Sequence, residues 1–283
     1  PGESGFVVAM GFTSGFPVGA VLTRQLYKQK LLSGMEAERL VSFTNNASPL
    51  FIIGVVGTSL FNNPATGYLL AVAHYLSNIL VGILIGRRVP LLHFPKSTRE
   101  NLFSVAWTEF IRAARHSKGP GHLLGEAIKK AILNVSIVGG FIVIFSVLTA
   151  ALSKWGVIIW LASLFQLLGA SYPCSIGLGV GCFEMTLGSQ ALAASSGSEL
   201  EKLLAVSGVL AWSGLSIQAQ VMSFVSGTPI RYLYYIRARL LQVLLSLSFT
   251  LVGYKLWSTS AHQVLTHIPP SSSTIPVVAL DFL

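Results

Sequence analysis

Three long apolar segments limit this chain to folds that cross a lipid bilayer. Residues 66–86 and 131–152 carry no acidic or basic side chain except His74, and residues 240–257 are charged only at Lys255. Each segment is about 20 residues long, which as a helix covers the ~30 Å hydrocarbon core of a membrane. In lipid, a segment can satisfy its backbone hydrogen bonds within itself only as a helix. We therefore predict an all-α, polytopic integral membrane protein.

Charged residues are few, and their distribution predicts the topology. Only 10% of the 283 residues are charged, against about 25% in soluble domains. Lys and Arg, which give a net charge of +9, gather in residues 24–39, 87–130 and 231–239. Such connections stay on the cytoplasmic side, so we place all three there and expect no nucleic-acid binding. Residues 87–130 are predicted to form amphipathic helices that lie on the membrane surface or pack on the bundle.

Other apolar segments are interrupted by helix-breaking residues. Residues 6–22 contain three glycines and a proline, residues 40–60 contain the run TNNASP at 44–49, and residues 155–194 are rich in glycine. Residues 203–225 carry serines and glutamines. Irregular backbone is tolerated inside a membrane only where protein buries it or where it lines a wet cavity. We predict that residues 6–22 and 155–194 are re-entrant and that their tips meet near mid-membrane.

The same pattern occurs twice along the chain. Residues 15–19 (GFPVG) resemble residues 177–181 (GLGVG), and residues 38–40 (ERL) resemble residues 201–203 (EKL). With the basic segments in the cytoplasm, the first copy opens from the cytoplasm and the second from outside, as in many secondary transporters. The predicted fold is a transmembrane helical bundle with two inverted repeats, each with a re-entrant helical hairpin and a broken helix. The first arm of the first hairpin is expected before residue 1, in an N-terminally truncated chain.

The prediction divides the chain into five parts. They are a first repeat (residues 1–86), a basic cytoplasmic loop (87–130), a linking transmembrane helix (131–152), a second repeat (153–257) and a polar C-terminal tail on the outer side of the membrane (258–283).

The helix breaks are the predicted substrate site. Free N–H groups at the starts of half-helices carry partial positive charge and favour an anion, particularly a carboxylate. Hydroxyl and amide side chains near the breaks would complete the site: Thr13, Ser14, Asn45, Asn46, Ser48, Ser171, Ser175, Ser213, Gln218 and Gln220. The alternative is that these groups only join helices, as polar residues do in any bundle. For the run at 44–49 we favour the functional interpretation, because so many polar groups inside a membrane are costly.

Few ionisable groups lie within the apolar segments. Glu184 could carry a coupling proton or cation, or could sit at the end of a hairpin within reach of water. His74 could relay protons, or could be a hydrogen-bonded helix contact. Cys174 and Cys182 match no metal-ligand or redox spacing. The sequence lacks HExxH, GxSxG and P-loop motifs, and its only aspartate is Asp281. We expect no enzyme activity, no metal and no cofactor.

Several motifs resemble the YlbJ family of sporulation integral membrane proteins. They are residues 11–20 (GFTSGFPVGA), 38–40 (ERL), 43–51 (FTNNASPLF) and 73–76 (AHYL), with further similarity at 228–239. The resemblance implies a Gate-type, or nucleoside-recognition, domain, which is also found in concentrative nucleoside transporters and a ferrous-iron transporter. It further implies a role in endospore formation, in moving dipicolinic acid, a pyridine dicarboxylate made in the mother cell, across the outer forespore membrane.

Two other functions stay open. A nucleoside permease would need acidic side chains for ribose hydroxyls, and Glu184 is the only such group near a hydrophobic centre. A membrane scaffold without transport activity could recruit partners through residues 87–130. The expected partners are dipicolinate and membrane lipid, with a homo-oligomer or other sporulation membrane proteins as further possibilities.

Overall fold

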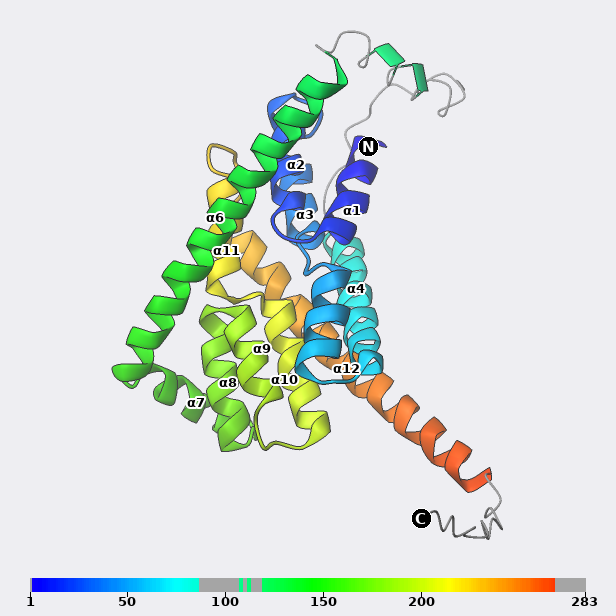
Figure 1. The fold of residues 1–283 in the computed structure, drawn as a ribbon, viewed down its shortest axis with the longest axis vertical. Coiled ribbons are helices and arrows are strands. Elements are labelled where there is room, and N and C mark those ends of the chain that lie inside the picture. Colours follow the sequence, from blue (N-terminus) through cyan, green and yellow to red (C-terminus); the bar gives the residue numbers. More distant parts are fainter. Residues whose placement is uncertain (1, 87–106, 109–110, 113–118, 268–283) are drawn as a thin grey trace, which may run out of the picture.

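The computed structural model describes residues 2–86, 107–108, 111–112 and 119–267, and they form an all-α bundle without a strand in those residues (Figure 1). Four stretches are long and apolar enough to cross a membrane: α4 (Pro64–Gly86), α6 (Pro120–Lys154), α10 with α11 (Glu199–Phe224), and α12 (Tyr232–His267). The predicted helical membrane fold is thereby confirmed. Most of the predicted amphipathic loop and the tail beyond residue 267 lie outside the described residues.

The three predicted spans are α4, α6 and α12, and two of them are longer than expected. α6 begins at Pro120, within the predicted loop, and ends at Lys154. α12 begins at Tyr232 and continues to His267, past the predicted end at residue 257. Both helices extend beyond their apolar segments. Flanking polar residues can continue the helix in water or at the membrane surface.

The first 60 residues form a helical pair followed by an interrupted helix. α1 (Gly2–Ser14) and α2 (Val18–Lys28) lie side by side, joined by a turn in which Gly15 has φ +79°. Both arms lie within this chain, so the expectation that the first arm precedes residue 1 is wrong. α3 (Gly34–Thr44) starts with a capping box between Ser33 and Glu36. It stops at Asn45, and the π-helix η1 (Leu50–Leu60) continues after the break.

The second half repeats this order with one additional helix. α7 (Val157–Leu167) precedes α8 (Tyr172–Phe183) and α9 (Met185–Ala193), and α10 (Glu199–Trp212) is separated from α11 (Gly214–Phe224) by Ser213. Residues 155–194 were predicted as one hairpin, but the hairpin is α8 with α9, and α7 packs beside it. α7 is a separate short helix because the chain turns at Gly169 and α8 starts directly after Ser171.

Glycines let the arms of the second hairpin touch. A Cβ on Gly188 of α9 would lie 2.3 Å from the Cα of Gly181 in α8. Gly177–Gly181 therefore belongs to helix packing rather than to a turn, which corrects the predicted match with residues 15–19. The sequence of the second turn is instead Phe183–Glu184–Met185. Close crossings of this kind are typical of membrane helices.

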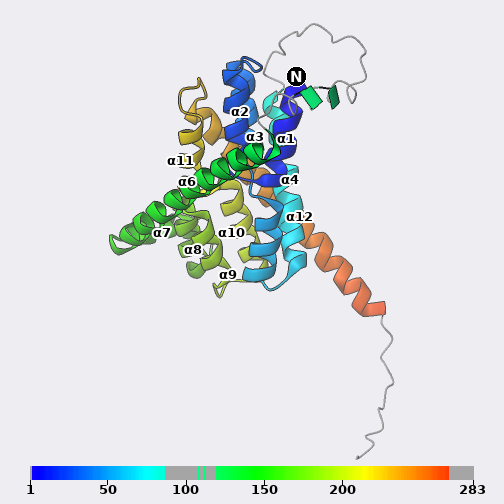
Figure 2. The same ribbon diagram turned by 45° about the horizontal axis from the view of Figure 1, so that its top comes forward.

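The two helical pairs enter the bundle from opposite ends (Figures 1 and 2). α1, α2 and α3 occupy one half of the molecule, and α8, α9 and α10 the other. Described residues of the basic segments lie at the first end: Arg231 pairs with Glu38 at 2.7 Å, and Arg39 Nε donates to the carbonyl of Gly82 near the end of α4. Arg239 is the exception, because it is fully buried in α12 and is not part of a polar connection.

Candidate functional site

The break in the first interrupted helix receives hydrogen bonds from two neighbouring helices, α2 and α4. Asn45 Oδ1 accepts from the backbone N–H of Ala20 at 3.1 Å, and Asn45 Nδ2 donates to the carbonyl of Val41 at 3.0 Å. Tyr75 Oη of α4 donates to the carbonyl of Ala47 at 2.8 Å. Part of the backbone of the run 44–49 is thus satisfied from another helix, and Pro49 starts η1 without needing a hydrogen bond from its nitrogen.

The turn between α1 and α2 packs directly on this break. A Cβ on Gly15 would lie 2.8 Å from the Cβ of Ser48, and one on Gly11 would lie 2.4 Å from the carbonyl oxygen of Thr44. Gly19 meets the same threonine. These positions require glycine because the hairpin and the broken helix approach at backbone distance.

The second hairpin and the second break meet in the same way. Ser213 and Gly214 both adopt left-handed conformations, with φ of 70° and 68°. A Cβ on Gly214 would lie 3.0 Å from the N atom of Met185, and Trp212 Nε1 donates to the carbonyl of Cys182 at 3.1 Å. Each hairpin turn therefore lies against a helix break. The two turn–break pairs adjoin, since α9 contacts η1 and α11 contacts α2.

Glu184 is buried at the second turn and caps α9. Its Oε2 atom accepts from the N–H of Leu187 at 2.6 Å. Glu184 therefore lies at a hairpin end, as one of the two interpretations expected, but it is buried and caps a helix instead of reaching water.

Six of the predicted site residues lie in or beside the two breaks. Asn45, Asn46, Ser213, Gln218 and Gln220 are buried, and Ser48 is partly buried. Gln218 spans the second break, because its Nε2 donates to the carbonyl of Trp212 at 3.1 Å while its Oε1 accepts from Tyr232 at 2.9 Å. Within the described residues, Asn46 Oδ1 and both amide atoms of Gln220 have no partner.

The other four predicted residues are placed differently. Thr13 and Ser14 are exposed at the end of α1, and Thr13 Oγ1 donates to the carbonyl of Ala9. Ser171 and Ser175 lie at the start of α8, where Ser171 N donates to Glu201 at 2.6 Å and Ser175 Oγ to Ser171 O. At ~1.5 Å per helical residue they are roughly 13–20 Å from Glu184 along α8. Ser171 and Ser175 therefore do not belong to the site at the breaks.

The residue that sequence reasoning missed is Arg239. Its side chain reaches the carbonyls of Ser42 and Asn45 at the first break and Asn78 Oδ1 of α4 at 3.1 Å. The guanidinium also lies 5.3 Å from the ring centre of Tyr235. Among the described residues it has no carboxylate partner. An ionised side chain buried in this way is costly and marks a functional site.

Arg239 belongs to a polar stripe on the buried face of α12. The stripe runs at helical spacing through Tyr235, Arg239, Gln242, Ser246 and Thr250, all with 0% exposure. Ser246 and Thr250 bond to Ser207 of α10 at 2.8 and 2.7 Å. The amide of Gln242 has no partner within the described residues. A signal was present in the sequence, namely polar residues at i, i+3 and i+4 within an apolar segment.

His74 faces this stripe from α4. Asn78 of α4 meets Arg239, and a Cβ on Gly253 of α12 would touch Leu69, so the two helices are antiparallel. His74 lies between Leu69 and Asn78 along α4 and is buried. Both imidazole nitrogens are buried without a partner in the described chain. The interpretation of His74 as a hydrogen-bonded helix contact is therefore not supported, because its imidazole makes no such bond to the described residues.

One curated relative shows the family. The sporulation integral membrane protein YlbJ of Bacillus subtilis (strain 168) is 38% identical over 286 residues, which cover 95% of this chain and 68% of the relative. The chain belongs to the YlbJ family. No family model and no solved structure matches it.

The motifs that carried the resemblance to the YlbJ family now have a structural role. Residues 11–20 form the first hairpin turn, residues 43–51 form the break on which that turn packs, and residues 73–76 supply Tyr75 and His74 beside it. In this YlbJ-family protein, the distinctive residues therefore gather around one helix break.

Proposed function

We propose that this protein is a membrane transporter that moves dipicolinic acid, a small aromatic dicarboxylate, across the outer forespore membrane. The supporting observation is that two hairpin turns pack on two helix breaks. Four helices, α2, η1, α9 and α11, begin in this region. Helix N-termini bind anions through free N–H groups and the helix dipole.

The charge inside the first break favours the same substrate class. Arg239 brings a positive charge that no carboxylate of the described residues balances, and its guanidinium Nε has no partner there. A dianion bound beside the first break would compensate this charge. A nucleoside has no such charge to offer, so we rank a nucleoside permease second.

We also infer that the two halves are inverted repeats, as secondary transporters often are. Glu184 follows Phe16 by 168 residues, and Ser213 follows Asn45 by the same interval, so turn and break recur in one register. This spacing replaces the predicted match through residues 177–181. An alternating-access movement of one half against the other would open the site to each side in turn. We propose no enzymatic step.

Transport of labelled dipicolinate into proteoliposomes tests the proposal, with uridine and an unrelated solute as comparison substrates. Dipicolinate should enter and uridine should not. A hydrogen bond to a charged carboxylate contributes about 1.5–3 kcal/mol, so Asn46→Ala should weaken apparent affinity by roughly 10- to 150-fold. Gln220→Ala, which removes a buried amide beside the second break, should also impair transport.

Ile83→Leu on the exposed face of α4 is the matched control and should transport normally. Uridine uptake would favour the permease, and absence of all uptake would favour a scaffold. Normal dipicolinate uptake by both polar variants below saturation would place the site elsewhere.

A further inference from the structure

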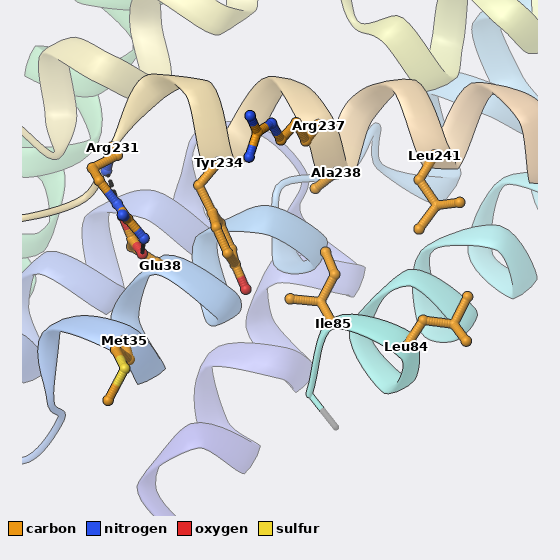
Figure 3. Close-up of a pocket in the computed structure, with 9 residues that line it drawn as sticks. All are labelled: Met35, Glu38, Leu84, Ile85, Arg231, Tyr234, Arg237, Ala238 and Leu241. Carbon is orange, nitrogen blue, oxygen red and sulfur yellow. Dashed lines mark hydrogen bonds and ion pairs between the residues drawn. The ribbon is translucent and has the colours of Figure 1, made fainter. Parts of the chain in front are cut away.

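A pocket of about 560 Å³ lies between the start of α3, the end of α4 and the start of α12 (Figure 3). It is separate from the helix breaks. α4 ends here at Gly86, and the next two residues in sequence are Arg87 and Arg88. The pocket therefore lies at the basic end of the bundle, at the level where lipid headgroups meet the protein in the predicted topology.

One wall of the pocket is polar and carries a net positive charge. Glu38 accepts from Arg231 at three points, from its N, Nε and Nη2 atoms at 2.8, 2.7 and 2.8 Å. These bonds raise the pKa of Arg231 and balance its charge against the carboxylate. Arg237 lies six residues after Arg231 on α12 and is exposed; among the described residues it has no hydrogen bond or ion pair. One guanidinium is thus free to bind an anion.

The opposite wall is apolar and continues into the outer surface of the bundle. Figure 3 shows Leu84 and Leu241 at the end of the pocket away from Arg231. Leu84 is exposed, and so are Ile83 beside it and Leu240 and Leu244 on α12. Exposed leucines on membrane-spanning helices face acyl chains. The pocket therefore joins a cationic end to a surface that contacts lipid tails.

We propose that this pocket binds an anionic phospholipid, with the phosphate at Arg237 and an acyl chain along Leu84 and Leu241. A soluble dicarboxylate would use the cationic end but would gain nothing from the apolar wall. A zwitterionic lipid would fill the apolar wall but would bring a cationic group to Arg237. Only a lipid of net negative charge matches both walls. The inference does not depend on which cargo the protein moves.

Lipid retention by the purified full chain tests this assignment. The protein is equilibrated in detergent with equal amounts of phosphatidylglycerol and phosphatidylcholine, repurified, and its bound lipids are quantified by mass spectrometry. Wild type should be enriched in phosphatidylglycerol. Arg237→Gln should lower bound phosphatidylglycerol about fivefold, since one basic residue near anionic lipid contributes about 1 kcal/mol. Lys154→Gln, an exposed basic residue that ends α6, should change nothing.

A second variant separates the two walls. Leu241→Trp fills the acyl end while it keeps Arg237, and it should lower retention of the lipid without a loss of the folded, monodisperse protein. Equal lipid binding by wild type and Arg237→Gln would overturn the proposal. Displacement of phosphatidylglycerol by inorganic phosphate or dipicolinate would overturn it as well, because the pocket would then hold a soluble anion.

Discussion

At the scale of single residues, Arg239 does most to define the first break. Three acceptors from two other helices depend on one guanidinium: the carbonyls of Ser42 and Asn45, and Asn78 Oδ1. A buried acceptor left without a donor costs about 1–3 kcal/mol. Arg239→Gln should therefore lower the melting temperature markedly and abolish transport. Arg239→Lys keeps the charge but not the fork of donors, and should be intermediate.

Lys154→Gln is the control for stability, because it removes an exposed basic side chain that lies outside both the breaks and the lipid pocket. A melting temperature and an uptake rate of Arg239→Gln equal to those of wild type would show that the break does not need the buried charge. Thermal unfolding followed by size-exclusion chromatography gives the first value, and proteoliposome uptake gives the second.

Gln242 allows structure and function to be separated at one position. Its buried amide has no partner within the described residues, so Gln242→Leu should leave the free energy of unfolding unchanged or raise it by about 1–2 kcal/mol. We expect dipicolinate uptake to fall nonetheless, because the polar stripe would lose its capacity to hold water or solute. Leu244→Ile on the exposed face of the same helix is the control. Unimpaired uptake by Gln242→Leu would leave the amide without a role in transport.

At the scale of elements, the hairpins depend on backbone contact. A Cβ on Gly188 would lie 2.3 Å from the Cα of Gly181, whereas one on Gly139 of α6 would meet nothing within 4 Å. Gly188→Ala should therefore destabilise the protein by about 1–3 kcal/mol through overpacking. Gly139→Ala should be neutral or slightly stabilising, since alanine favours a helix. The two melting temperatures make the comparison, and equal values would mean that the arms of the hairpin can move apart freely.

At the scale of the whole molecule, the topology can be tested from both ends. Arg237 lies at the basic end, predicted to be cytoplasmic, and Lys154 lies where α6 ends on the other side (Figure 1). In a variant with Cys174 and Cys182 replaced by serine, Lys154→Cys should react with an impermeant thiol reagent in intact cells. Arg237→Cys should react only after permeabilisation. The reverse labelling pattern would invert the whole bundle.

The sequence by itself determined the membrane class, the three uninterrupted spans and the interruptions within residues 6–22 and at 44–49. Hydropathy and helix-breaking residues act locally, since every segment in lipid must satisfy its own backbone. The distribution of basic residues separately predicted that the connections around residues 24–39 and 231 share one end of the bundle, where Arg231 pairs with Glu38.

Only the tertiary structure decided which groups meet at the breaks. Arg239 was assigned to a basic loop because charge counts along a chain do not show which face of a helix a side chain occupies. Packing of α12 against α3 and α4 turns it inward, onto carbonyls 194 and 197 residues away in sequence. The same limit applies to Ser171 and Ser175, whose helix α8 carries them to the far end of the hairpin. Contacts between distant segments depend on how helix faces pack, and no local pattern contains that information.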